Sequence, residues 1–138
     1  MRYRVLLAGA LALSACGQKS YSMTVTGSTS AGPGDTFACI KKQLGELGYK
    51  QTSNDVDEFR VTASKLDYKT RRPDVQFRRM INKLDVDVAA EANGQTGIHV
   101  LGRTFADYVT HRGPTEQEEK PSEQVQADSK ALLERCRS

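Results

Sequence analysis

The chain has 138 residues, of which 38% are hydrophobic and 27% are charged, a composition typical of one globular domain. Its 20 basic residues outnumber its 17 acidic residues only slightly. Two of the basic residues, Arg2 and Arg4, stand at the very start, so the chain from residue 16 onward carries 18 basic and 17 acidic residues. This near balance gives no overall electrostatic basis for binding nucleic acid.

The first fifteen residues have the form of a secretory signal peptide. A basic leader, residues 1–4, precedes the eleven uncharged and mostly apolar residues 5–15. A helix of eleven residues is roughly 16 Å long, about half the thickness of a bilayer's hydrocarbon core, so it is too short to span one. A basic leader, a short apolar stretch and a small-residue exit together indicate export.

The exit of this leader, Leu13-Ser14-Ala15-Cys16, resembles the lipobox of bacterial lipoproteins at all four positions. The resemblance implies cleavage between Ala15 and Cys16, so that residues 1–15 are the lipoprotein signal peptide. It also implies a diacylglycerol on the sulfur of Cys16, with acyl chains such as palmitate, which anchors the protein stably in a membrane. The alternative is a signal peptide in which the cysteine is incidental and cleavage occurs elsewhere.

Gly17 bears on which membrane the resemblance implies. Asp at this place commonly retains Gram-negative lipoproteins in the inner membrane, so Gly17 implies the periplasmic face of the outer membrane in such a host. Residues 16–20 are then a lipidated tether, and its last four residues reach roughly 13 Å when extended. We expect residues 21–138 to form a single domain close to the bilayer.

The first half of this domain predicts a strand, a helix and a second strand. Residues 21–26 alternate apolar and polar side chains, which predicts a strand with one buried face. After a loop at 27–34, Asp35 is the expected N-cap of a helix that Gly48 ends. The second strand covers residues 59–64. The buried stripe of the helix is expected to contain Phe37, Ile40, Leu44 and Leu47.

The second half predicts two longer strands and a final helix. Residues 84–92 and 98 to about 109 form the strands, joined by a turn at Asn93-Gly94 that is longer than two residues. The alternation breaks at Gly102, which predicts a β-bulge there. Residues 113–121 are polar and acidic, and we interpret them as a surface connection. Ser122 is the expected N-cap of the last helix.

The element order β-α-β-β-β-α predicts an α+β fold, in which a four-stranded, mainly antiparallel sheet carries two helices on one face. Cys39 and Cys136 then lie on two neighbouring helices. Export favours disulfides, so we expect these cysteines to be bridged, and the alternative is two unrelated buried thiols. Small envelope lipoproteins that assist outer-membrane assembly include domains of similar layout, but layout is not function.

A basic segment between Arg60 and Lys83 is the main candidate binding feature. It contains eight basic and two acidic residues, with Tyr68 and Phe77 among them. Three interpretations remain open: a solvated hairpin, a surface that contacts anionic lipid headgroups, and a surface for an envelope protein. The residues proposed to contact an anionic surface are Lys69, Arg71, Arg72, Arg78 and Arg79.

The remaining polar residues give weaker signals. The acidic residues before the last helix, from Glu116 to Glu123, fit a helix dipole better than a cation site. His99 and His111 belong to no metal-ligand motif, and we expect no cofactor and no metal site. The sequence therefore predicts a non-catalytic interaction or envelope-maintenance module anchored by lipid. The alternatives are a domain that binds lipid or a small molecule and, less favoured, a small hydrolase.

Overall fold

The computed structural model describes residues 21–137, which form an α+β domain with a six-stranded antiparallel sheet and two helices. The predicted signal peptide, the predicted lipidation site Cys16 and the predicted tether to residue 20 lie outside the described residues. The elements in chain order are β1 (Met23–Thr29), α1 (Pro33–Glu46), β2 (Lys50–Asp55), β3 (Arg60–Asp67), β4 (Phe77–Ala90), β5 (Thr96–Thr110), β6 (Gly113–Glu119) and α2 (Glu123–Arg137).

The prediction of an α+β fold with two helices is confirmed, but the predicted number of four strands is wrong. The two additional strands are β2 and β6, and β6 replaces the surface connection predicted at 113–121. Every residue of β2 is exposed, and β6 contains no large apolar side chain. Because neither strand buries a face of its own, neither leaves the alternating pattern by which the other strands were found.

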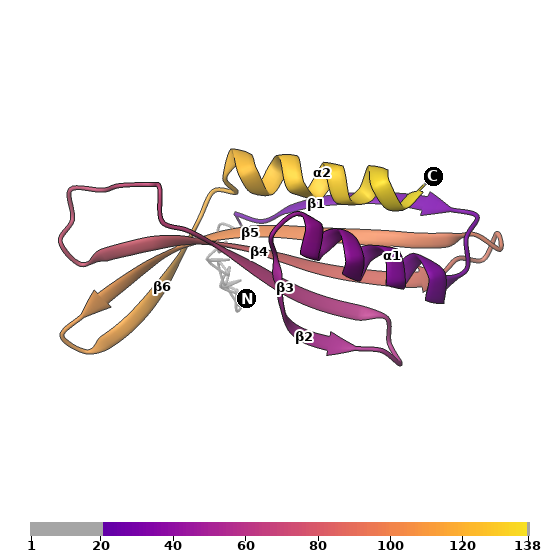
Figure 1. The fold of residues 1–138 in the computed structure, drawn as a ribbon, viewed down its shortest axis with the longest axis horizontal. Coiled ribbons are helices and arrows are strands. Elements are labelled where there is room, and N and C mark those ends of the chain that lie inside the picture. Colours follow the sequence, from indigo (N-terminus) through magenta and orange to yellow (C-terminus); the bar gives the residue numbers. More distant parts are fainter. Residues whose placement is uncertain (1–20, 138) are drawn as a thin grey trace, which may run out of the picture.

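The two longest strands, β4 and β5, set the shape of the molecule. The sheet order is β1-β5-β4-β3-β2, and β6 also pairs with β5. Thr96 to Gly102 of β5 pair with β1, while Thr104 to Thr110 pair with β6. The end of the sheet that carries β6 extends beyond the helices (Figure 1). We call this extension, residues 68–80 and 105–119, the lobe.

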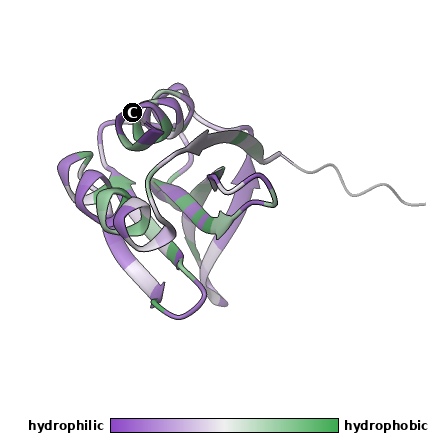
Figure 2. Cartoon of the chain, turned by 90° about the vertical axis from the view of Figure 1, so that its right-hand side faces the viewer, coloured by the Kyte–Doolittle hydropathy of each residue, from purple (hydrophilic) through white to green (hydrophobic). Residues whose placement is uncertain are grey.

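Both helices lie on one side of the sheet, as predicted, and the core lies beneath them (Figures 1 and 2). Three residues of the predicted helix stripe, Phe37, Ile40 and Leu44, are buried there, while Leu47 is partly buried. The even-numbered residues of β4 from 84 to 88 face the same core, because side chains alternate across a strand. The sheet supplies Leu84, Val86, Val88, Ile98 and Val100 to this core.

The helix ends agree with the sequence in two places and differ in one. Gly48 ends α1 with a φ of 85°, and Ser122 caps α2 by accepting a hydrogen bond from the N–H of Val125 at 3.1 Å. The predicted N-cap at Asp35 is wrong, because Gly32 holds that position and Pro33 starts the helix. Proline fits the first helical turn since its missing N–H would have no partner there.

The disulfide between Cys39 and Cys136 joins α1 to α2, with 5.8 Å between the two Cα atoms. Cys136 is 5% exposed and belongs to the core, while Cys39 packs against that core from its edge. The predicted bridge is therefore present. It joins two helices that are neighbours in the fold but are separated in the sequence by most of the domain.

The opposite face of the sheet carries no helix among residues 21–137 and is covered by ion pairs. Acidic and basic side chains alternate on neighbouring strands of this open face, so each charge has an opposite charge beside it. The pairs are Arg60–Asp87, Arg103–Asp85 and Lys83–Glu116, each at 2.7 Å, and Arg79–Asp107 at 3.0 Å. This face is charged but nearly neutral.

Candidate functional site

The structure divides the five basic residues proposed for an anionic surface into two groups, although all five lie in the lobe. Both terminal nitrogens of Arg72 donate hydrogen bonds to the carboxylate of Glu119 at 2.5 Å. One of them also donates to the hydroxyl of Tyr108 at 2.9 Å. Arg79 donates to Tyr68 Oη and to Asp107, each at 3.0 Å. These two arginines therefore hold the loop before β4 onto the sheet.

The ion pair between Arg72 and Glu119 also fixes the charges of both groups. The hydrogen bonds with Glu119 raise the pKa of Arg72, and the same bonds lower the pKa of the Glu119 carboxyl. Both side chains stay charged across the physiological range because each partner favours the ionised form of the other. Their charges are directed to each other, so neither side chain is a free contact for a surface.

The second group, Lys69, Arg71 and Arg78, is exposed and forms no ion pair within residues 21–137. The guanidinium of Arg71 donates to the backbone carbonyl of Tyr68 and leaves its charge uncompensated. The same segment contains two other exposed side chains, the aromatic Tyr68 at 56% and the apolar Val75 at 98%. The lobe therefore ends in free cations and exposed apolar groups together.

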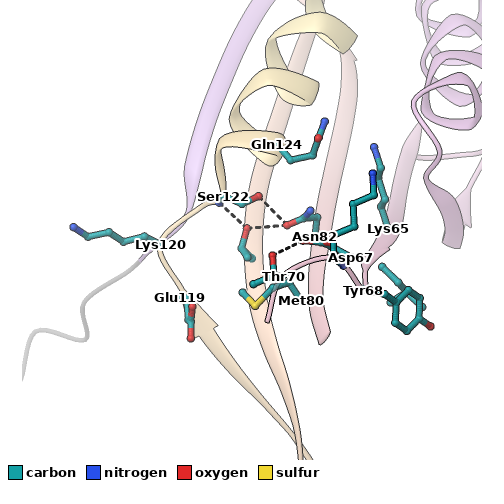
Figure 3. A pocket seen from close by; sticks show the side chains of 13 residues that line it. Lys65, Asp67, Tyr68, Thr70, Met80, Asn82, Glu119, Lys120, Ser122 and Gln124 are labelled. Atoms are coloured by element: carbon teal, nitrogen blue, oxygen red, sulfur yellow. Dashed lines mark hydrogen bonds between the residues drawn. The ribbon is translucent and has the colours of Figure 1, made fainter. Parts of the chain in front are cut away.

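A pocket of about 600 Å³ lies on the helix side of the sheet, where α2 begins and the lobe branches away. We call it the waist pocket. Its floor is formed by Met80 and Asn82 of β4 and Thr104 of β5, and Ser122 borders it from the start of α2 (Figure 3). Lys65 of β3 lies on the opposite wall.

A buried hydrogen-bond network fixes the floor of the waist pocket. The side-chain oxygen of Asn82 accepts from Thr104 Oγ1 at 3.1 Å and from Ser122 Oγ at 2.9 Å. The backbone N–H of Ser122 donates to Thr104 Oγ1 at 2.9 Å (Figure 3). Asn82 and Thr104 are each 2% exposed. The network thus joins the start of α2 rigidly to two central strands.

The waist pocket was not predicted from the sequence, although polar residues within apolar phases mark it. Met80, Leu84 and Val86 are apolar and face the helices, and Asn82 stands in the same phase between them. Thr104 interrupts the apolar phase of β5 opposite it. A polar residue in an apolar phase indicates a buried hydrogen bond, but only the fold shows that Asn82, Thr104 and Ser122 meet.

A second buried polar cluster lies near the pocket and has a structural role. Tyr49 donates its hydroxyl to Asp128 at 2.9 Å, and Lys65 lies 3.4 Å from the same carboxylate. Burial, followed by the charge of Asp128, raises the pKa of Tyr49, so its hydroxyl stays protonated as a donor. Lys65 also donates to the carbonyl of Leu47 at 2.8 Å. These bonds join α2 to β3 and to the end of α1.

The acidic residues before α2 do not act mainly on the helix dipole. Glu116 and Glu119 lie on β6 and pair with Lys83 and Arg72, so they secure the lobe, while Glu123 begins α2. Within residues 21–137 no three His, Cys, Asp or Glu side chains gather where they could hold a metal ion. The part of the chain that the structure describes also contains no helix long and apolar enough to cross a membrane.

The two histidines lie apart on the surface. His99 is exposed near the start of β5, and His111 is exposed in the turn after it. Neither lines the waist pocket. No family model matches the chain, and no curated protein matches its sequence, so its function has to be argued from these sites.

Proposed function

We propose that this protein is a lipid-anchored lipoprotein of the bacterial envelope. In this role its domain acts without catalysis as an interaction module, and the lobe contacts anionic lipid headgroups. The observation that carries this proposal is that Lys69, Arg71 and Arg78 are exposed without an ion pair in the lobe that also exposes Tyr68 and Val75. Such a combination suits a membrane interface, where apolar groups insert shallowly and cations meet phosphates.

The direction of β1 supports the same orientation. Met23, at the start of β1, pairs with Gly102 next to the point where β6 ends, and β1 then runs away from the lobe. A tether of residues 16–20 would join the domain at this position. Because its last four residues reach roughly 13 Å, a bilayer that holds Cys16 would lie within reach of the lobe.

The open face of the sheet is a weaker candidate for the contact. Its charges are paired with each other over β3, β4, β5 and β6, so a partner would have to replace existing ion pairs. In contrast, the free cations of the lobe would gain roughly 1 kcal/mol each near an anionic surface. We therefore assign the membrane contact to the lobe.

Vesicle sedimentation tests the membrane contact. In a chain that begins at Gly17 and carries no lipid, we expect Lys69→Glu with Arg71→Glu to weaken binding to phosphatidylglycerol vesicles by at least about 30-fold. Loss of the two cations alone corresponds to about 2 kcal/mol, and repulsion of the two new carboxylates adds to it. Val75→Asp should weaken binding as well, because it places a charge where an apolar group would insert.

The matched control changes the same charge elsewhere. Lys42 and Lys130 are exposed on α1 and α2, away from the lobe. Lys42→Glu with Lys130→Glu should leave vesicle binding within about threefold of the unmodified chain, after screening at physiological salt. Equal losses in the lobe pair and the control pair would mean that overall charge, not the lobe, governs binding.

The lipid anchor has a separate test in cells. With Cys16→Ser, we expect the protein to lose all labelling by a fatty-acid analogue and to leave the membrane fraction, because only a thiol accepts the diacylglycerol. Adding Ser20→Cys to this variant restores a thiol outside the lipobox and should not restore the label. Labelling that persists in Cys16→Ser would refute the lipoprotein assignment.

A further inference from the structure

The floor of the waist pocket carries a side-chain hydrogen-bond donor for which the described residues supply no acceptor. The side-chain oxygen of Asn82 accepts two hydrogen bonds, from Thr104 and Ser122. Its side-chain nitrogen has no acceptor among the described residues, although Asn82 is 98% buried. Figure 3 shows this nitrogen on the side of the amide turned away from Ser122. Because the two hydrogen bonds to the oxygen fix the amide, this nitrogen is held at the pocket, where it can donate to an oxygen of a ligand.

The electrostatic surroundings of this donor favour an anion. Lys69 and Lys120 line the pocket and form no ion pair within residues 21–137, and α2 begins beside the pocket floor, where the helix dipole adds positive potential. The two carboxylates of the pocket are already engaged: Asp67 accepts from Thr70 Oγ1 and from the N–H of Lys69, both at 2.7 Å. Glu119 is paired with Arg72. An incoming anion would therefore meet the charges of Lys69 and Lys120 against the single carboxylate of Asp67, which has no ion-pair partner within residues 21–137.

The floor becomes apolar toward the lobe. Met80 precedes Asn82 by two positions on the same face of β4, so the two side chains are separated by about 7 Å along the strand. This distance matches a short alkyl chain that begins at an anionic group over Asn82. The volume of the pocket, about 600 Å³, is in the range of small-molecule sites.

We propose that the waist pocket binds an anionic amphiphile, a carboxylate or phosphate group that carries an apolar chain. The anionic oxygens accept a hydrogen bond from the amide nitrogen of Asn82, and the chain lies over Met80. This ligand site goes beyond the membrane contact of the lobe, since it takes a single molecule from solution and needs no bilayer. It gives the lipoprotein a second, pocket-based binding activity.

Titration of a ¹⁵N-labelled chain that begins at Gly17 tests the site without vesicles. The probes are octyl phosphate and octanoate, both kept below micelle formation, and the readout is the side-chain amide signal of Asn82. We expect saturable shifts of this signal, with inorganic phosphate and octanol at least tenfold weaker. The better of the two amphiphiles identifies the head group. If neither amphiphile shifts the signal, or if octanol binds equally well, the site is not an anionic-amphiphile site.

An isosteric variant gives the sharpest test. Asn82→Asp keeps the oxygen that accepts from Thr104 and Ser122 but replaces the free donor with a negative oxygen. We expect affinity for the better amphiphile, measured by calorimetry, to fall at least tenfold while the fold is retained. Asn93→Asp makes the same change in the β4–β5 turn, far from the pocket, and should leave affinity unchanged. Equal affinity in Asn82→Asp would overturn the proposal.

A second variant keeps the test independent of the buried network. Met80→Gln conserves side-chain length but makes the apolar end of the floor polar. It should weaken octyl phosphate about fivefold and leave inorganic phosphate unchanged, whereas equal binding of octyl phosphate would overturn the proposed chain position. The lobe variant Val75→Asp should not alter either titration, so failure of the pocket and failure of the membrane contact are distinguishable.

Discussion

Reduction of the Cys39–Cys136 disulfide is expected to lower the free energy of unfolding by about 4–5 kcal/mol. The bridge closes a loop that spans nearly the whole described domain, with a sequence separation of 97. In the chain-entropy model, a closed loop of this length restricts the unfolded chain by that amount. Urea unfolding of the oxidised and reduced protein, followed by circular dichroism, measures the difference.

Two observations accompany this result if the bridge acts as described. The native protein should show no reactive thiol from Cys39 or Cys136 until it is reduced, and Cys39→Ala with Cys136→Ala should unfold identically with and without reductant. A change below about 1 kcal/mol on reduction would mean that the packing of α1 against α2 is sufficient without the bridge.

Gly102→Ala is expected to destabilise the domain by about 3 kcal/mol, the next largest effect. A Cβ atom at this position would lie 2.5 Å from Val125 Cγ1 and 3.0 Å from Ser129 Oγ. Both contacts belong to α2, whose other end is fixed by the disulfide, so the helix cannot move away freely. Overpacking of a well-filled core commonly costs 1–3 kcal/mol, and a contact this short lies at the upper end.

A double-mutant cycle separates this clash from other effects of the substitution. Val125→Ala removes the Cγ1 atom that the new methyl group would meet, so it should recover part of the loss in Gly102→Ala. Gly45→Ala is the matched control, because nothing lies within 4 Å of its Cβ position in α1, and alanine there should stabilise the helix. An additive cycle would show that Val125 is not the cause.

The β-bulge predicted at Gly102 is wrong, although the break in the apolar alternation at this glycine is real. The broken alternation at this glycine predicted a β-bulge, yet Gly102 pairs regularly with Leu84 and with Met23. The glycine is required because α2 passes close above it, not because the backbone of β5 bends. A glycine inside a strand is compatible with both explanations, and they differ only in what lies opposite.

The residues predicted for an anionic surface illustrate the same limit. All five basic residues lie in the lobe, as their closeness in the sequence suggested. Arg72 and Arg79 nevertheless pair with Glu119 and Asp107, residues from other strands, and their charges are not free. Asp107 lies on β5, but Glu119 lies on β6, a strand whose polar sequence gave no alternating pattern, so the pairing of Arg72 could not be predicted.

The elements that bury one face could be predicted from the sequence, namely the stripe of α1 and the apolar phases of β4 and β5. Burial forces a period of 3.6 or 2 on the apolar residues, and that period is visible in the chain. The same periods placed Cys39 and Cys136 on neighbouring helices, where the expected bridge is present. The pairing of β2 and β6, the approach of α2 to Gly102 and the meeting of Asn82 with Ser122 could be seen only in the folded domain. These features depend on which segments lie opposite each other, and exposed strands or buried polar contacts leave no period from which that could be inferred.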